Sequence, residues 1–106
     1  MINKSKCEQL ILIAPNEIKD DIVDQLIGLS QLSGFSLSEI NGYSREHSHF
    51  DIREQVEGYR KFHRFEIYLD SDETAAVLMS LKPVCASAAV RYWILPVSTT
   101  GSFDAL

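Results

Sequence analysis

The stretch CEQLILIAPNEIKDDIVDQLIGL, residues 7–29, has the pattern of a strand that is followed directly by a helix. The continuous apolar run Leu10–Ala14 is typical of a central strand that is covered on at least one face. Pro15 stops this strand, and Asn16 can cap the helix. Apolar residues then recur at helical spacing: Ile18, Ile22, Leu26 and Leu29. We therefore predict a helix over about residues 17–32.

The rest of the chain divides into further strands and a second helix. Phe35–Ile40 is predicted to be an edge strand because its alternation of apolar and polar residues is imperfect. Regular alternation over residues 65–69 predicts a half-buried strand. Asp70 and Glu73 form a capping-box pair at the start of a second helix. Val90–Val97 is predicted to be the last strand.

This order of elements predicts a ferredoxin-like βαββαβ sandwich of the α+β class, an antiparallel four-stranded sheet with two helices on one face. From the length of 106 residues, we expect a single domain, residues 1–106. Strand neighbours alternate sides, so four aromatic residues cannot all point under the helices: Phe62, Tyr68, Tyr92 and Trp93. An open sheet face with aromatic side chains is typical of self-association, and we expect a homo-oligomer.

Composition restricts the classes of function. The 10 basic and 15 acidic residues give a net charge of −5, which argues against general binding of nucleic acid or anionic membranes. The early apolar run Leu10–Ala14 is too short for a signal peptide or a membrane span, so we expect a cytoplasmic protein. Cys7 and Cys85 make no disulfide framework, and we expect reduced thiols at the ends of the core. Walker loops, nucleophile elbows and paired carboxylates are absent from the sequence, and we expect no enzyme activity.

Two of the three histidines, His47 and His49, lie in the polar connection of residues 42–58. Imidazoles at i and i+2 share one face of an extended segment and can bind Zn²⁺, Cu²⁺ or Ni²⁺. His63 or a cysteine thiolate could complete such a shell. The alternative is a solvated loop that binds no metal.

Chain direction suggests which groups lie near this connection. We take the first and third strands to run parallel, which places their starts, the connection and the end of the second helix at one end of the sheet. The histidines and cysteines would then all lie toward that end: Cys7, His47, His49, His63 and Cys85.

Positive charge is concentrated around the same connection. Five of the 10 basic residues lie within it or just beyond it: Arg45, Arg53, Arg60, Lys61 and Arg64. Such a cluster can bind a phosphate or a carboxylate. The preferred interpretation is a solvated strand rim that is largely neutralised by the nearby acids Asp51, Glu54 and Glu57.

The segment FSLSEINGYSR, residues 35–45, resembles the second strand of the PII signalling proteins, the nitrogen regulatory proteins in which a serine- and glutamate-containing run leads through glycine into the T-loop. Residues 61–69 resemble the strand that leaves that loop, and residues 92–97 resemble the last strand. The sequence is most similar to the short, uncharacterised PII-like proteins often encoded beside heavy-metal RND efflux pumps.

The resemblance implies a homotrimer with the sheets facing inward, as in PII and the similarly folded CutA proteins. It implies a small effector in the cleft between subunits, and a loop of about residues 43–59 that is presented to a protein partner such as a membrane transporter, for example a heavy-metal efflux pump. Gly42 and Arg45 match the start of the loop and a ligand contact. The position of the phosphate-binding B-loop is taken by Cys85, Ala86 and Ser87.

This B-loop position departs from the PII pattern. Residues 85–89, CASAA, contain neither lysine nor the glycines that allow close approach to phosphate. Residues 98–100 lack the paired arginines of PII. These differences argue against ATP or ADP as the effector, and the Cys85 thiol favours a transition metal. The alternative function is a CutA-like metal-binding protein linked to metal efflux or tolerance, with His47, His49 and His63 as ligands. A purely structural oligomer is a third interpretation.

Overall fold

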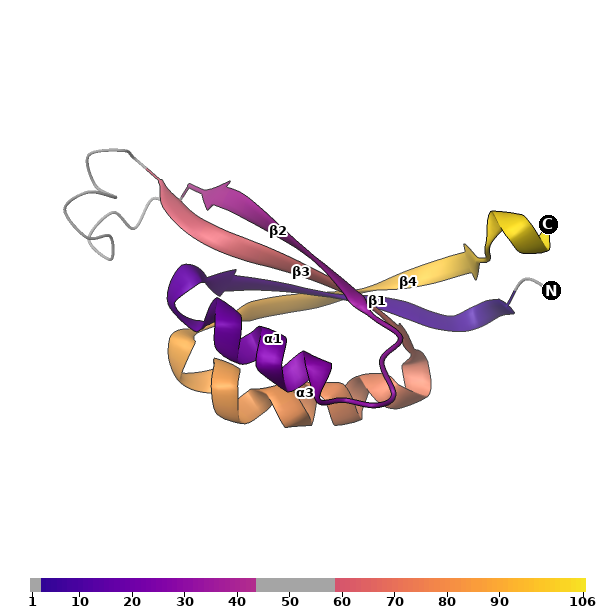
Figure 1. Cartoon of the computed structure of the whole chain (residues 1–106), viewed down its shortest axis with the longest axis horizontal. Helices are drawn as coiled ribbons and strands as arrows, with labels where there is room; N and C mark the ends of the chain where they lie inside the picture. Colours follow the sequence, from indigo (N-terminus) through magenta and orange to yellow (C-terminus); the bar gives the residue numbers. More distant parts are fainter. Residues whose placement is uncertain (1–2, 44–58) are drawn as a thin grey trace.

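The computed structural model describes residues 3–43 and 59–106 (Figure 1). Two helices lie on one face of a four-stranded sheet whose strand order is β2-β3-β1-β4. All neighbouring strands are antiparallel. The strands and helices are β1 (Asn3–Pro15), α1 (Lys19–Ile27), β2 (Phe35–Gly42), β3 (Arg60–Asp70), α3 (Ser71–Cys85) and β4 (Arg91–Thr100). The short 3-10 helices are η1 (Asn16–Ile18), η3 (Ala86–Ala88) and η4 (Phe103–Ala105). The predicted ferredoxin-like βαββαβ fold is confirmed.

The first helix is shorter than the predicted range of about residues 17–32. Asn16 lies inside η1 and does not cap α1, whose N-cap residue Ile18 makes no side-chain capping bond. At the other end, α1 stops before Gly28, because glycine has a low helix propensity. Leu29 still packs against the core from the turn that follows.

The second helix begins after Asp70, as predicted, but the Asp70 side chain makes no capping hydrogen bond. Asp72 and Glu73 lie in the first turn of α3, where carboxylates are favoured by the helix dipole. Pro83 lies in the last turn of this helix. No helix in the described ranges 3–43 and 59–106 is long and apolar enough to cross a membrane.

The core lies between the two helices and the central strands β1 and β3. Along both strands alternate residues point toward the helices, because strand side chains alternate sides. The core residues are Leu10, Leu12, Ala14, Ile22, Leu26, Phe65, Ile67, Leu69, Val77 and Leu81. Burial of each large apolar side chain stabilises the fold by about 1.5–3 kcal/mol. This common core holds the ends of the central strands and of α3 in fixed positions.

The expected parallel arrangement of the first and third strands is wrong. β1 and β3 are antiparallel neighbours, with Cys7 opposite Asp70 and Ala14 opposite His63. β1 runs parallel to β2, from which β3 separates it, and β3 runs parallel to β4, from which β1 separates it. Cys7 therefore lies at the end of the sheet opposite to the 43–59 connection. His63 and the end of α3 at Cys85 lie at the connection's own end, as expected, since β4 starts there with Arg91 opposite Ile13.

The predicted aromatic residues lie on both faces of the sheet. Trp93 pairs with Ile11 and Tyr92 with Leu12, and paired residues on neighbouring strands point to the same side. Tyr92 is thus on the helix side, while Trp93 faces the open side. Exposed Leu95 lies on the open side as well. α3 packs over β1 and β3, whereas β4 is an edge strand (Figure 1). Almost all residues of β4 are exposed.

Candidate effector site at the base of the 43–59 connection

The predicted site residues fall into two groups. Arg45, His47 and His49 lie outside the described residues. The others lie at one end of the sheet: Gly42, His63, Cys85, Ala86 and Ser87. Among these, Gly42 ends the edge strand β2, while η3 with Ala86 and Ser87 leads to the other edge strand, β4.

Gly42 is packed against an aromatic ring. A Cβ atom at this position would lie 2.3 Å from Cδ2 of Phe62. The guanidinium group of Arg60 lies 5.5 Å from the centroid of the same ring, and its Nη2 donates to Oε2 of Glu17 at 3.1 Å. Close packing under Phe62 is therefore the physical reason for a glycine where the connection begins.

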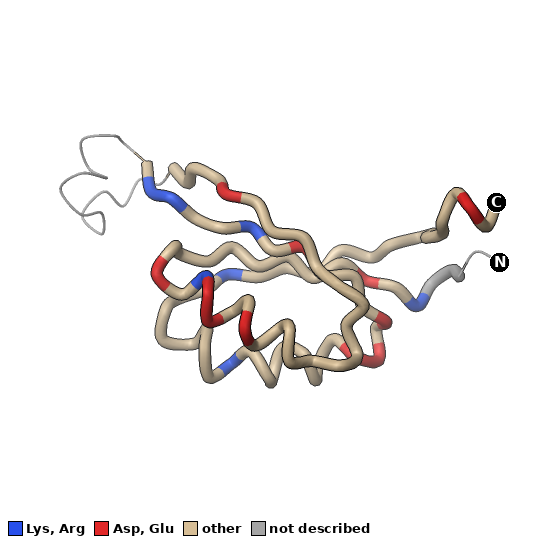
Figure 2. Tube along the Cα trace, viewed as in Figure 1, with Lys and Arg blue, Asp and Glu red and all other residues tan. Residues whose placement is uncertain are grey.

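Each described member of the predicted basic cluster is close to a carboxylate. Besides the Arg60 contact with Glu17, Nζ of Lys61 lies 3.7 Å from Oε1 of Glu39, and Nε of Arg64 lies 3.1 Å from Oε2 of Glu66. In Figure 2 the basic positions lie together along β3, with acidic positions farther along β3 and on the neighbouring β2. Exposed pairs of this kind contribute only about 0–1 kcal/mol each, but they reduce the local positive potential. The carboxylates in these pairs are those of Glu17, Glu39 and Glu66. The acids expected to neutralise the rim lie outside the described residues, and their role stays a prediction: Asp51, Glu54 and Glu57.

His63 is the only predicted metal ligand among the histidines that the structure describes, and its side chain is 7% exposed. Its Nδ1 is buried and has no hydrogen-bond partner within the described residues. Lys19, which bonds to Asp20, lowers the pKa of that carboxyl, and the charge of His63 adds to this effect. Within residues 3–43 and 59–106, no three His, Cys, Asp or Glu side chains are placed to hold a metal ion. A metal site would therefore need residues outside the described ranges, such as His47 and His49, and it stays a prediction.

The segment that follows α3 contains a backbone feature that sequence reasoning missed. Ala89 has φ 55° and ψ 40°, the left-handed conformation. For a residue with a Cβ atom this conformation costs about 1–2 kcal/mol, whereas glycine adopts it freely. Residues 85–89 lack the B-loop glycines of PII, yet the chain makes a glycine-like turn at Ala89. Nothing in the alanine-rich sequence could have indicated it.

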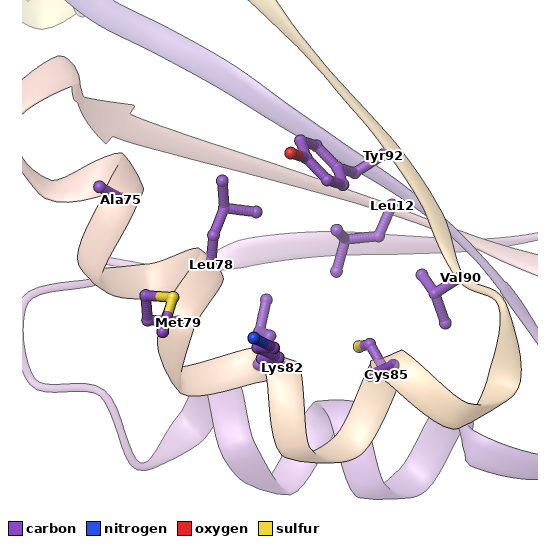
Figure 3. Close-up of a pocket in the computed structure, with 10 residues that line it drawn as sticks. Leu12, Ala75, Leu78, Met79, Lys82, Cys85, Val90 and Tyr92 are labelled. Atoms are coloured by element: carbon purple, nitrogen blue, oxygen red, sulfur yellow. The ribbon is translucent and has the colours of Figure 1, made fainter.

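Cys85 lies at the edge of an apolar groove between α3 and β4. The thiol is half-buried, and its desolvation raises the pKa. The groove has a volume of about 390 Å³, and Leu78 and Tyr92 point toward it from opposite walls (Figure 3). Met79 and Lys82 also line it. Sequence reasoning did not find this groove, because it results from α3 leaving β4 uncovered.

The fold of this chain is the fold of PII proteins of known structure. The structure of Arabidopsis thaliana PII bound to citrate aligns with a TM-score of 0.70 and 14% identity, over 94% of this chain and 82% of that one. CPII, a nitrogen regulatory PII-like protein from Thiomonas intermedia bound to ADP, AMP and bicarbonate, aligns with a TM-score of 0.71 and 11% identity, over 96% and 98% of the two chains. Identities this low show a shared fold.

More specifically, the chain belongs to the DUF3240 family, described as proteins of unknown function, which it matches over residues 4–104. The crystal structure of a DUF3240 family protein from Shewanella baltica aligns with a TM-score of 0.78 and 46% identity, over 93% of this chain and 98% of that one. No curated protein matches the sequence.

Proposed function

We propose that this chain is a trimeric PII-like regulatory module without enzyme activity. It binds a small effector in the cleft between subunits, and it presents the loop of about residues 43–59 to a protein partner. The proposal is supported by the shared fold and by the location of the candidate site residues on the two edges of one sheet.

The observation that carries the proposal is that the two parts of the site lie on opposite edges. Gly42 ends β2, and η3 precedes β4, with β3 and β1 between these edge strands. Three strand spacings separate the edges by about 14 Å. In a head-to-tail ring the β2 edge of one copy meets the β4 edge of the next. The two parts of the site then form one cleft, and each cleft is built from two subunits.

Assembly is supported by the surface that the fold leaves uncovered. Trp93 and Leu95 are exposed on the open face of the sheet, and β2 and β4 are edge strands. Exposed strand edges and aromatic faces are surfaces that proteins cover by pairing with another chain. A trimer with inward-facing sheets would cover the open face of the sheet and its two edge strands.

The effector is expected to be small and not to be ATP or ADP. The segment 85–89 contains no lysine, and each of Arg60, Lys61 and Arg64 already lies beside a carboxylate. Little free positive charge is then left among these groups to neutralise a triphosphate. A protein partner such as a membrane transporter would be recognised by the loop once the effector has ordered it.

Transition-metal binding is the second candidate function. It is favoured by the buried Nδ1 of His63, which lacks a hydrogen-bond partner within the described part of the chain. Most buried polar side-chain atoms in folded proteins have a hydrogen-bond partner or bind a metal ion. A metal held by His63 together with His47 and His49 would supply one.

Native mass spectrometry tests both functions on the full chain, alone and with Zn²⁺, Cu²⁺, Ni²⁺, ADP, ATP and citrate. We expect a trimer that takes up a small ligand and then resists tryptic cleavage at Arg45 and Arg53. A protein that stays monomeric at all concentrations contradicts the proposed trimeric regulatory module. Metal uptake that disappears in the His47→Ala/His49→Ala variant, with the trimer intact, supports the second function.

A further inference from the structure

The segment after β4 ends in an exposed apolar surface. Phe103 and Leu106 are 91% and 84% exposed. They are joined by one 3-10 turn, in which the Leu106 N–H donates to the Phe103 carbonyl oxygen at 3.2 Å. Residues at i and i+3 of a 3-10 turn lie on the same side. The two side chains thus form a single apolar projection, which we call the C-terminal knob (Phe103–Leu106).

The groove between α3 and β4 has the complementary character. Its walls are apolar, with Leu78, Met79 and Tyr92 facing a volume of about 390 Å³ (Figure 3). This volume lies in the range of pockets that hold a compact ligand, roughly 300–1,000 Å³. An open apolar groove of this size is a surface that a soluble protein covers.

The C-terminal knob and the groove also carry opposite charges. Lys82 is the one cation that lines the groove, and no carboxylate of the described chain pairs with it. In the knob, Asp104 directly follows Phe103, and its carboxylate accepts a hydrogen bond from the Ser102 hydroxyl. A knob seated in the groove brings an acidic group to the rim where the ammonium group lies.

The knob cannot reach the groove of its own chain. β4 runs from the groove at Tyr92 to Thr100, and an extended segment of that length covers about 27 Å. In Figure 1 the knob lies beyond the helices, at the end where both termini are found, whereas η3 lies at the opposite end. A contact between a knob and a groove therefore joins two copies of the chain.

We propose that the C-terminal knob of one copy fills the α3–β4 groove of a second copy, with Phe103 in the apolar part and Asp104 beside Lys82. The inference rests on the self-association in the proposed function and adds a specific contact to it. The knob then closes the groove beside Cys85 and Ala86, so the neighbouring copy contributes a wall to the candidate site.

Photo-crosslinking of the full chain tests this contact. With p-benzoylphenylalanine in place of Phe103, we expect a product of twice the chain mass whose crosslinked peptide lies within residues 75–92. The same substitution at Ile27, which is 70% exposed on α1, is the matched control and is expected to give no such product.

Assembly measurements give a second test. Phe103→Ala is expected to raise the dissociation constant of the assembly about tenfold or more, as for a buried aromatic anchor, whereas Ile27→Ala leaves it unchanged. Lys82→Glu and Asp104→Lys each weaken assembly, and the double variant recovers it.

The outcomes separate this contact from the proposed function. A monomeric wild-type protein overturns both. An assembly that forms while the photo-crosslink maps to another surface or another protein, or while Phe103→Ala has no effect, overturns the contact alone. The contact is also overturned if the dye ANS binds in the groove of the assembled wild-type protein, because the groove would then be open to a small apolar ligand.

Discussion

Ala89→Gly is expected to stabilise the protein, although the replacement of alanine by glycine usually lowers stability. Ala89 has φ 55° and ψ 40°, and a Cβ atom in this conformation costs about 1–2 kcal/mol. Glycine removes that cost but gives the unfolded chain more conformational freedom, worth about 0.4–1 kcal/mol. The difference is a net gain of roughly 0.8 kcal/mol in the free energy of unfolding.

Urea denaturation at a fixed protein concentration measures this effect. With a urea dependence of about 1–3 kcal/mol/M, a gain of that size raises the unfolding midpoint by roughly 0.3–0.8 M. The matched control is Ala76→Gly on the exposed surface of α3. At this position glycine replaces alanine inside a helix, and we expect the free energy of unfolding to fall by about 1 kcal/mol. Equal destabilisation by both substitutions would refute the left-handed conformation of Ala89.

Two further substitutions test the packing and the titration of the site. Gly42→Ala is expected to lower the free energy of unfolding by about 1–3 kcal/mol, because the added Cβ atom overlaps the Phe62 ring; in a Phe62→Ala background the same change should cost little, and an equal cost in both backgrounds would contradict the overlap. Burial raises the pKa of Cys85 above its ordinary value of 9.0, so the folded state holds this proton more tightly than the unfolded chain. Stability is then unaffected well below pH 9.0 and falls as the pH rises from there through the folded-state pKa. Denaturation curves from pH 7 to 11 should show a smaller alkaline loss for Cys85→Ser than for the wild type, and identical alkaline slopes would exclude this thiol as a cause.

The sequence by itself determined the elements and the fold class. The apolar run Leu10–Ala14 predicted a central strand, and the imperfect alternation of Phe35–Ile40 predicted an edge strand; both predictions are confirmed. Such patterns are readable because burial on one face imposes a period of two on strands and about 3.6 on helices. Gly42 is required by close packing against Phe62, and Lys61 pairs with Glu39. Both contacts depend on which strands are neighbours in the sheet, and the periodicity of the sequence does not show which strands are neighbours.

Tertiary structure alone decided the relative placement of the site groups. The antiparallel pairing of β1 with β3 moved Cys7 to the far end of the sheet, because the chain's path, and not its local pattern, sets strand direction. The left-handed turn at Ala89 is imposed where α3 must connect to β4, against the preference of alanine. The α3–β4 groove exists because α3 packs over β1 and β3 and leaves the edge strand β4 uncovered. Each of these features results from long-range packing, whose free energy outweighs the local preferences that a sequence pattern reports.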